Sequence, residues 1–353
     1  MHCELIVPAL LPQDPHAAAA LGEARLPGLE MLLARGRRTA DESRPLEAWL
    51  MEAFGGDPDA EIPAGALTLT GLGGESAGAA WMRADPSHLR LNRDQLILVP
   101  AVAFGLQAAE SEALAEALNR HFAGQLVFYP LKADRWCVRL ESLDAGGLRT
   151  KTPAQVAGRD INRHLPAGEG SIRWHQVLNE IQMVLHEHPV NEAREARGEP
   201  AVNSVWLWGA GRLQSGLRAP FQSVTADDPL AHGFAHTAGL RHRFVPADAE
   251  TWMDRLAGEG RQLVVLDTLR MPLALSDYDT WGARIVELEA RWFAPLVAAL
   301  TAGSVSMVTV LVPDGTELRA FESTRNDLRH FWRRPKPLAS FFQNTMRAVR
   351  PVR

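Results

Sequence analysis

The sequence predicts an α/β protein in which a mostly parallel sheet is flanked by helices and carries a small inserted α+β module. Residues 263–266 (LVVL) are apolar without alternation, which is typical of a strand buried on both faces of a parallel sheet. Segments with strand and helix patterns alternate along most of the chain, as they do in α/β folds. From Ala84 to about Arg173 the order becomes strand, helix, strand, strand, which indicates a separate α+β module.

The composition bounds the kind of protein this chain can be. Its 353 residues are too many for one small core, and 46% hydrophobic against 22% charged residues allow large buried cores. The formal net charge of −5 argues against bulk binding to nucleic acid or anionic membranes. Cys3 and Cys137 lie far apart, no apolar run approaches the ~20 residues that span a bilayer, and no signal-peptide pattern opens the chain. We therefore expect a cytoplasmic protein without membrane attachment.

The first part of the chain contains one predicted strand and two predicted helices. Residues 4–9 (ELIVPA) are a short apolar run and the expected first central strand. Residues 26–36 predict a helix, because proline stands near the start and glycine just past the end. A second helix is expected over residues 45–54. Residues 65–78 are mostly small and show no firm periodicity, so we expect a loop there, in which Leu67 and Leu69 could belong to a strand.

The predicted module follows. A strand at residues 96–99 precedes a helix at 112–122 with Ser111 as its cap, and residues 126–131 and 135–140 form a hairpin. A loop rich in glycine, proline and arginine then returns the chain to the main fold. The expected domains are an α/β core of residues 1–84 and 174–353, and an inserted α+β module of residues 85–173.

The core is expected to resume with a helix at residues 174–188, whose apolar side chains recur at helical spacing. Pro189 ends this helix, a short polar helix covers residues 191–197, and residues 205–208 (VWLW) form a buried strand. Later elements complete the alternation. They are helices at residues 229–240, 251–258 and 278–300, a weak strand at 243–245, and strands at 263–266 and 306–312.

Two glycine and histidine motifs invite a functional reading that their contexts do not support. Gly209-x-Gly211 follows a strand but lacks the third glycine and the later acidic residue of a dinucleotide site, so we interpret it as a turn. His232, His236 and His242 could place imidazoles near one another for a metal, but no glutamate lies between the first two in the manner of a metalloprotease helix. Solvated or capping histidines explain them more simply.

Two aspartates stand where an α/β active site is expected. Asp267 follows the strand at residues 263–266, and Asp314 follows the strand at 306–312. Ligands of open α/β sheets bind outside the carboxyl ends of the parallel strands, so these acids could share a site. Ordinary loop aspartates are the alternative explanation.

The C-terminal part of the chain is basic and aromatic. His330 precedes the run FWRRPKP, and from Arg325 onward eight Lys and Arg residues face one acid. Arg333, Arg334 and Lys336 could bind a phosphate or an acidic partner. A solvated terminus is the alternative.

Residues 188–211 resemble a known family, the metal-dependent, cofactor-independent phosphoglycerate mutases of the archaeal type in the alkaline phosphatase superfamily. Residues 26–36 look like a helix of the same family, and the strand order and the inserted module agree with it. The chain is also similar to a group of bacterial mutase-like proteins described as regulatory, from a cluster of pathogenicity factors. The matching positions in the first stretch are His188, Pro189, Asn191, Arg194, Gly198, Asn203, Gly209 and Gly211.

The resemblance implies an alkaline phosphatase-like core, two divalent metals held by carboxylates and histidines, and a serine or threonine nucleophile, for which Ser76 is the candidate. The chain departs from the family at this chemistry. Residues 8–11 (PALL) stand where an Asp-Gly metal motif is expected, and neither Asp267 nor Asp314 is followed by the family's histidine. Asp267, Asp314 and His330 could make at most one incomplete site, although a two-metal phosphoryl transfer needs many converging ligands.

We therefore expect a non-catalytic, mutase-like binding or regulatory protein that has lost the two-metal site and has no cofactor. One divalent metal, Mn or Zn, is the alternative. The expected partner is a phosphorylated metabolite or a protein. The rival hypothesis is an active phosphomutase or phosphoesterase with rearranged ligands such as Asp277, Asp279 or His330. Nucleic-acid regulation through residues 329–336 is a third possibility, against which the acidic balance argues.

Overall fold

The structure is a computed structural model, and it describes every residue of the chain except 43, 77, 257–259, 314–316 and 343–353. The chain divides into two compact units. Unit 1 contains residues 1–53, 219–227 and 239–353, and unit 2 contains residues 54–218 and 228–238. The domain boundaries expected from the sequence differ from these limits, and the division into a core and an inserted module stays a prediction.

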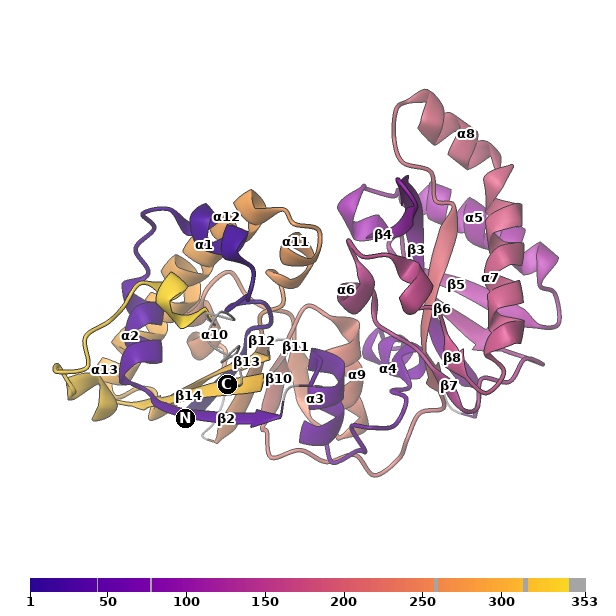
Figure 1. The fold of residues 1–353 in the computed structure, drawn as a ribbon. Helices are drawn as coiled ribbons and strands as arrows, with labels where there is room; N and C mark the ends of the chain where they lie inside the picture. Colours follow the sequence, from indigo (N-terminus) through magenta and orange to yellow (C-terminus); the bar gives the residue numbers. More distant parts are fainter. Residues whose placement is uncertain (43, 77, 257–259, 314–316, 343–353) are drawn as a thin grey trace, which may run out of the picture. The chain divides into compact units, whose positions relative to one another are not determined.

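Unit 1 is built on a seven-stranded sheet with the order β11-β10-β12-β1-β13-β14-β2 (Figure 1). Neighbouring strands from β11 to β13 pair in parallel, whereas β14 pairs antiparallel with both β13 and β2. The predicted fold class, a mostly parallel sheet flanked by helices, is therefore confirmed. The strands are β1 (His2–Ile6), β2 (Arg37–Glu42), β10 (Ser223–Thr225), β11 (Arg241–Arg243), β12 (Arg261–Val265), β13 (Met307–Pro313) and β14 (Glu317–Thr324).

The helices of unit 1 bury apolar side chains against this sheet. Leu29 of α2, Trp281 of α12 and Leu296 of α13 belong to one core with Leu5 and Val310 of the central strands. The helices are α1 (Pro15–Leu21), α2 (Pro27–Arg35), α3 (Leu46–Ala53), α10 (Ala249–Asp254), α11 (Arg270–Ala274), α12 (Tyr278–Leu288) and α13 (Ala294–Ala302), with a π-helical turn (Glu289–Phe293) between the last two.

The start of α2 is capped by a carboxylate from a distant part of the chain. The Gly28 and Leu29 N–H groups donate to Glu289 at 2.7 and 2.9 Å, and Glu289 is buried. A helix begins with unpaired N–H groups that a negative charge satisfies well. Glycine is needed at position 28, because a Cβ there would lie 2.7 Å from the backbone nitrogen of Ala294.

Unit 2 is built on a five-stranded sheet in which every pairing is antiparallel (Figure 1). The long strand β3 pairs with β4, β6 and β9, and β5 pairs with β6. The sequence placed residues 205–208 in the α/β core, but β9 lies in this second sheet. The strands are β3 (Ala80–Asn92), β4 (Gln95–Pro100), β5 (Leu126–Lys132), β6 (Arg135–Leu140) and β9 (Ser204–Gly211), with β7 (Leu148–Arg149) and β8 (Ala167–Gly168) forming a separate two-stranded sheet.

Helices α5 and α7 bury their apolar faces against the sheet of unit 2. Leu114 and Leu118 of α5 and Val177 and Ile181 of α7 share one core with Val205 of β9. The helices are α4 (Ala64–Gly71), α5 (Ala108–His121), α6 (Pro153–Val156), α7 (Ser171–His186), α8 (Pro189–Ala196) and α9 (Pro229–Thr237). Of the helices in the described residues, none is long and apolar enough to cross a membrane.

The expected loop at residues 65–78 is wrong, because α4 occupies its first half. The helix is buried on almost all sides, so it shows no amphipathic pattern. Its small residues serve a close contact with α9: a Cβ on Gly71 would lie 1.9 Å from the Pro229 carbonyl, and one on Gly233 would lie 2.0 Å from the Leu67 carbonyl.

Gly209 lies in a strand irregularity rather than in a phosphate-binding turn. It has a φ of +65°, and its N–H donates to the Thr150 hydroxyl at 2.8 Å. The Glu61 carboxylate also lies 3.2 Å from that N–H group and accepts from Thr150. The nitrogen that a phosphate would need is therefore occupied by side chains of the chain itself.

Candidate functional site

The carboxyl edge of the parallel strands in unit 1, where an α/β ligand site is expected, is lined by apolar residues after β1. Leu10 and Leu11 are fully buried in the core. Ala9 adopts a left-handed φ of +64°, and its carbonyl accepts a hydrogen bond of 2.9 Å from the Trp281 indole. The place where the resemblance predicts the first metal motif thus contains packed aliphatic side chains.

The C-terminal segment of the described chain lies over the same edge. Arg319, on β14, is buried and donates to the carbonyls of Phe341 at 2.8 Å and Leu11 at 3.0 Å. The Phe342 ring lies 6.2 Å from Trp281. These contacts join the end of the chain to the turn after β1, and they bury a cation against main-chain carbonyls.

Asp267 lies at this edge, as the sequence predicts, since it follows β12 by two residues. Its carbonyl accepts from the Arg270 N–H at 3.1 Å. The Arg270 guanidinium in turn donates to the buried Glu47 carboxylate of α3 at 2.8 Å. Asp267 therefore stands at the start of a turn whose arginine is paired with a neighbouring helix.

His330 lies near the end of the sheet where the parallel strands begin, whereas Asp267 lies where they end. Because β14 runs antiparallel to β13, with Thr324 opposite Met307, the chain leaves β14 where the parallel strands begin. His330 follows within six residues, and its Nδ1 atom is 3.9 Å from Asp327. A seven-residue strand spans about 20 Å, so the structure does not bring His330 and Asp267 together. Asp314 lies outside the described residues.

Residues 7–11, directly after β1, carry no side chain that binds a divalent metal. Among the described residues, no three or more His, Cys, Asp or Glu side chains gather in a way that could hold a metal. Divalent metals in such centres need converging carboxylate and imidazole ligands. Leu10 and Leu11, by contrast, offer no donor atoms.

Ser76, the candidate nucleophile, is buried in unit 2. Its hydroxyl oxygen lies 2.8 Å from the Thr70 hydroxyl oxygen of α4. A nucleophilic serine is activated by a neighbouring base or by a metal ion. The Thr70 hydroxyl beside Ser76 is not such a base.

A buried ion pair in unit 2 was not foreseen from the sequence. Arg83 and Asp85, two residues apart on β3, point to the same face and form an ion pair. Arg83 also donates to the Thr68 hydroxyl at 3.2 Å, and the Trp208 indole donates to Asp85 at 2.7 Å. Burial raises the pKa of the Asp85 carboxyl, and the charge of Arg83 opposes that rise. In the sequence, only the two-residue spacing of these charges could have indicated the pair.

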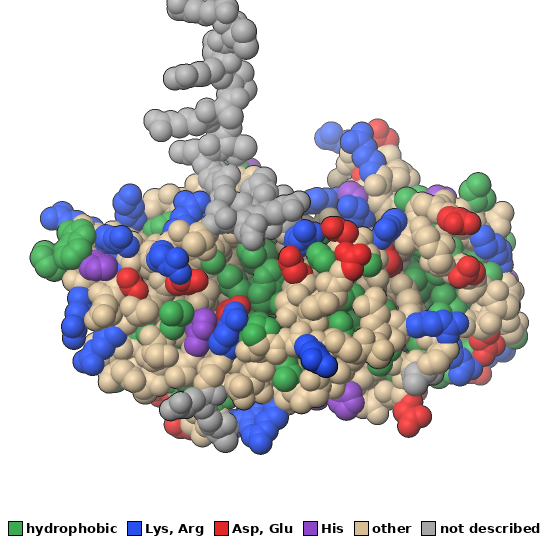
Figure 2. Space-filling model, turned by 90° about the horizontal axis from the view of Figure 1, so that it is seen from below, with side chains coloured by type: hydrophobic (Ala, Val, Ile, Leu, Met, Phe, Trp, Pro, Cys, Tyr) green, Lys and Arg blue, Asp and Glu red, His purple; other side chains and the backbone are tan. Residues whose placement is uncertain are grey.

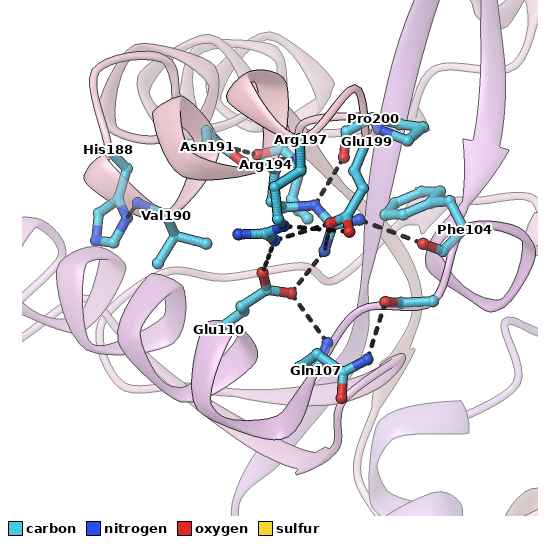
Figure 3. A network of polar contacts seen from close by, with 12 residues as sticks. Phe104, Gln107, Glu110, His188, Val190, Asn191, Arg194, Arg197, Glu199 and Pro200 are labelled. Carbon is cyan, nitrogen blue, oxygen red and sulfur yellow. Dashed lines mark hydrogen bonds and ion pairs between the residues drawn. The ribbon is translucent and has the colours of Figure 1, made fainter.

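The residues that carry the family resemblance form a second polar network in unit 2 (Figure 3). Arg194 is fully buried and donates to Glu110 at 2.6 Å, to the Pro200 carbonyl at 2.8 Å and to the Phe104 carbonyl at 3.2 Å. Arg197 donates to the other Glu110 oxygen at 2.7 Å. The network ties α8 to α5 and to the loops beside them.

The other matched positions are also structural. The Asn191 amide donates to the carbonyls of Leu185 and Val202, and its oxygen accepts from the Val202 N–H. His188 caps α8, since its Nδ1 accepts from the Val190 N–H at 3.3 Å (Figure 3). The motif of residues 188–203 therefore holds two helices and the start of β9 in place.

The basic C-terminal residues lie on the surface of unit 1. Arg333 donates to the carbonyl of Arg35, the last residue of α2, at 3.1 Å, and Arg35 donates back to the Arg333 carbonyl at 3.4 Å. Arg334 and Lys336 are exposed. The three residues do not enclose a ligand, but they share one stretch of surface.

Comparisons with known proteins point to one family. The model of the 2,3-bisphosphoglycerate-independent phosphoglycerate mutases matches residues 76–191. A probable mutase of this kind from Geobacter sulfurreducens is 31% identical over 210 residues, which cover 57% of this chain and 52% of the relative. A mutase from Methanothermobacter thermautotrophicus is 30% identical over 165 residues, covering 44% and 40%. The chain thus spans about half the length of the curated relatives it matches.

A solved structure supports the fold. A protein from Pyrococcus horikoshii aligns with a TM-score of 0.54 at 13% identity, covering 92% of this chain and 87% of that one. The resemblance predicted from the sequence is confirmed at the level of a phosphoglycerate mutase-like protein.

One expectation is corrected by the relatives. We expected no cofactor, but the curated relatives are cofactor-independent mutases, the class for which the resemblance implies divalent metals. The names of these relatives state independence from 2,3-bisphosphoglycerate and do not mention metal ions. The expectation that this chain has no cofactor is therefore wrong, because its relatives belong to a class for which the resemblance implies divalent metals.

Proposed function

We propose that this chain, a phosphoglycerate mutase-like protein, is a binding or regulatory protein that recognises a phosphorylated metabolite or a protein partner and does not interconvert phosphoglycerates. The observation that supports this proposal is the filled carboxyl edge of unit 1. Leu10 and Leu11 are packed where the family's first metal motif is expected, and Arg319 fastens the C-terminal segment over them.

The proposal concerns turnover and not metal content. Phosphoryl transfer in this class depends on groups that hold and orient both the attacking and the leaving oxygens. Placing a carboxylate at position 10 or 11 would bury a charge among apolar side chains, which costs several kcal/mol unless the charge is paired. The neighbouring Arg319 is engaged with main-chain carbonyls.

The rival function is an active phosphomutase or phosphoesterase with rearranged ligands. The names of the relatives favour it. Of its proposed ligands, Asp277 accepts from the Thr280 N–H at 3.1 Å as the cap of α12, and hydrogen bonds from Thr280 lower its pKa. His330 lies at the edge of the sheet away from Asp267, so these two cannot share one ion.

Assays of the purified full chain separate the two functions. We would measure interconversion of 2- and 3-phosphoglycerate and hydrolysis of p-nitrophenyl phosphate with Mn²⁺ or Zn²⁺ supplied, beside an active relative as positive control. We expect rates equal to those of the Ser76→Ala and Asp267→Asn variants. Turnover that either substitution abolishes would overturn the proposal. Binding of the two phosphoglycerates, measured by calorimetry, tests the metabolite half separately.

A further inference from the structure

One stretch of the surface of unit 1 combines exposed aromatic rings with positive charge. It consists of Arg329, Phe331, Trp332, Arg333, Arg334 and Lys336, here called the aromatic–basic patch. At the left end of the face in Figure 2, hydrophobic side chains stand out beside histidine and several Lys or Arg side chains. We propose that this patch docks a short acidic segment of a partner protein, with an apolar side chain of the segment held against the two rings.

The two rings are the anchor of the proposed site. Phe331 and Trp332 are 76% and 64% exposed, and their centroids lie 5.3 Å apart in an edge-to-face arrangement. The His330 ring lies 4.8 Å from Trp332 on another side. Aromatic side chains that already pack on one another lose little freedom on binding, and tryptophan and arginine are the residues that most often dominate interfaces.

The backbone that presents the rings is fixed at both ends. Leu328 and Leu338 are buried in the core of unit 1, one on each side of the patch. Between them, Arg35 donates to the Leu328 and Arg333 carbonyls, and Arg333 donates to the Arg35 carbonyl. The exposed rings therefore belong to a segment tied to α2.

The charge of the segment is opposite to that of the whole chain. Residues 325–336 contain five Lys or Arg and one acid, Asp327, in a chain of net charge −5. Asp327 is engaged within the segment, since it accepts from the Thr324 N–H at 2.9 Å and hydroxyl at 2.6 Å. Charge complementarity of this kind selects acidic partners and speeds their association.

Geometry favours a peptide over the other anionic occupants. A small phosphorylated metabolite is held in a concave site, whereas rings exposed on most of their surface project outward. A short acidic peptide contacts the patch alone.

The inference deepens the partner half of the proposed function and rests on it, but its test does not involve turnover. A fluorescein-labelled peptide of twelve residues, acidic except for one central leucine, would be titrated with the full chain and followed by fluorescence anisotropy. We expect Trp332→Ala and Phe331→Ala each to weaken binding at least about tenfold. Raising NaCl from 50 to 500 mM should weaken it by a similar factor.

Matched controls come from unit 2. Ile172→Ala removes a side chain that is 76% exposed, and Arg90→Glu reverses an exposed charge, so both should leave binding unchanged. The double variant Arg334→Glu, Lys336→Glu should weaken binding and flatten its salt dependence. An acidic peptide with glycine in place of leucine should bind at least about tenfold more weakly.

Several results would overturn the proposal. The first is peptide binding that Trp332→Ala and Phe331→Ala leave unchanged. The second is binding to phosphatidylserine vesicles or oligothymidine but not to the peptide. The third is self-association of the chain that Trp332→Ala abolishes. Failure here with no phosphoglycerate turnover leaves the proposed function standing on its metabolite half. Phosphoglycerate turnover together with peptide binding would contradict the proposed function but support the docking surface.

Discussion

The two units of this chain bury polar side chains in different ways. Unit 2 buries ion pairs, Arg83 with Asp85 and Arg194 with Glu110, and each arginine also bonds to further groups. The sheet edge of unit 1 is apolar, and its buried cation, Arg319, is held by main-chain carbonyls. The arginines of these unit 2 networks are paired with carboxylates, whereas the cation at this sheet edge of unit 1 is held by backbone acceptors. Elsewhere unit 1 also buries an ion pair, Arg270 with Glu47.

The family likeness and the departures from it follow the same division. The family model matches residues 76–191, which all belong to unit 2. The place where the resemblance predicts a metal motif lies in unit 1, after β1, where Leu10 and Leu11 are packed. A network such as that of Arg194 resists change because removing one member leaves the others buried and unpaired.

The largest effect should come from breaking the Arg194 network. Arg194→Ala leaves Glu110 without its buried partner and two carbonyls without donors, which should cost about 3–5 kcal/mol. Arg197 binds the same Glu110 but is 48% exposed, so Arg197→Ala should destabilise unit 2 much less. Urea unfolding followed by hydrogen exchange in peptides of unit 2 measures both. Equal losses would show that burial does not distinguish the two arginines.

Unit 1 offers a smaller counterpart in the carboxylate that caps α2. Glu289→Ala leaves the Gly28 and Leu29 N–H groups unsatisfied and should cost about 2–3 kcal/mol, localised to unit 1. Glu287, two residues earlier, pairs with Arg284 and Arg291 near the surface, so Glu287→Ala should cost under about 1 kcal/mol. The measurement is hydrogen exchange of the first turn of α2. Unchanged exchange in Glu289→Ala would argue against the cap.

The sequence predicted the parallel sheet of unit 1 because its strands carry their own signal. Residues 263–266 are apolar on both faces, and β12 and Asp267 lie where that pattern places them. The same reasoning failed for β9. Val205 and Leu207 on one face and Trp206 and Trp208 on the other make it equally apolar on both sides. Only its antiparallel pairing with β3 distinguishes the two sheets. Pairing depends on segments more than a hundred residues apart, which local patterns do not record.

The site could be predicted in its parts and not in its assembly. The expectation that His330 belongs with Asp267 missed β14, whose polar sequence gives a weak strand signal, and this strand carries the chain to the other edge. The loop expected over α4 failed because small residues on all sides hide a helical period. The Arg83–Asp85 pair needed Thr68 and Trp208, which only the fold brings to it.

The pH dependence of unit 2 should reveal Glu110. Burial raises the pKa of this carboxyl, but hydrogen bonds from the Gln107 N–H, Arg197 and Arg194 outweigh burial and hold the pKa below its ordinary value. A depressed pKa contributes stability that is present above the unfolded value of about 4.3 and is lost as the pH falls through the lower folded value. Glu110→Gln should therefore unfold with a shallower loss of stability on the acid side.

The control for that measurement is Glu112→Gln, which removes an exposed carboxyl from the same helix without touching either arginine. Its stability should fall with decreasing pH as that of the wild type does. Urea midpoints of unit 2 between pH 3 and pH 6 give the comparison. If Glu110→Gln lost as much stability as the wild type between pH 6 and pH 3, packing and not charge would stabilise the network.

The smallest effect is expected at Ser76. An active phosphomutase would need a nucleophile there, whereas the proposed binding protein would not. Ser76→Ala removes one buried hydroxyl contact with Thr70, which should cost about 1 kcal/mol in unit 2. Thr70→Val removes the other partner of the same contact and should cost a similar amount, so the pair gives a double-mutant cycle for a structural hydrogen bond. A nucleophile would break this symmetry, because only the Ser76 substitution would then change phosphoryl turnover while both changed stability alike.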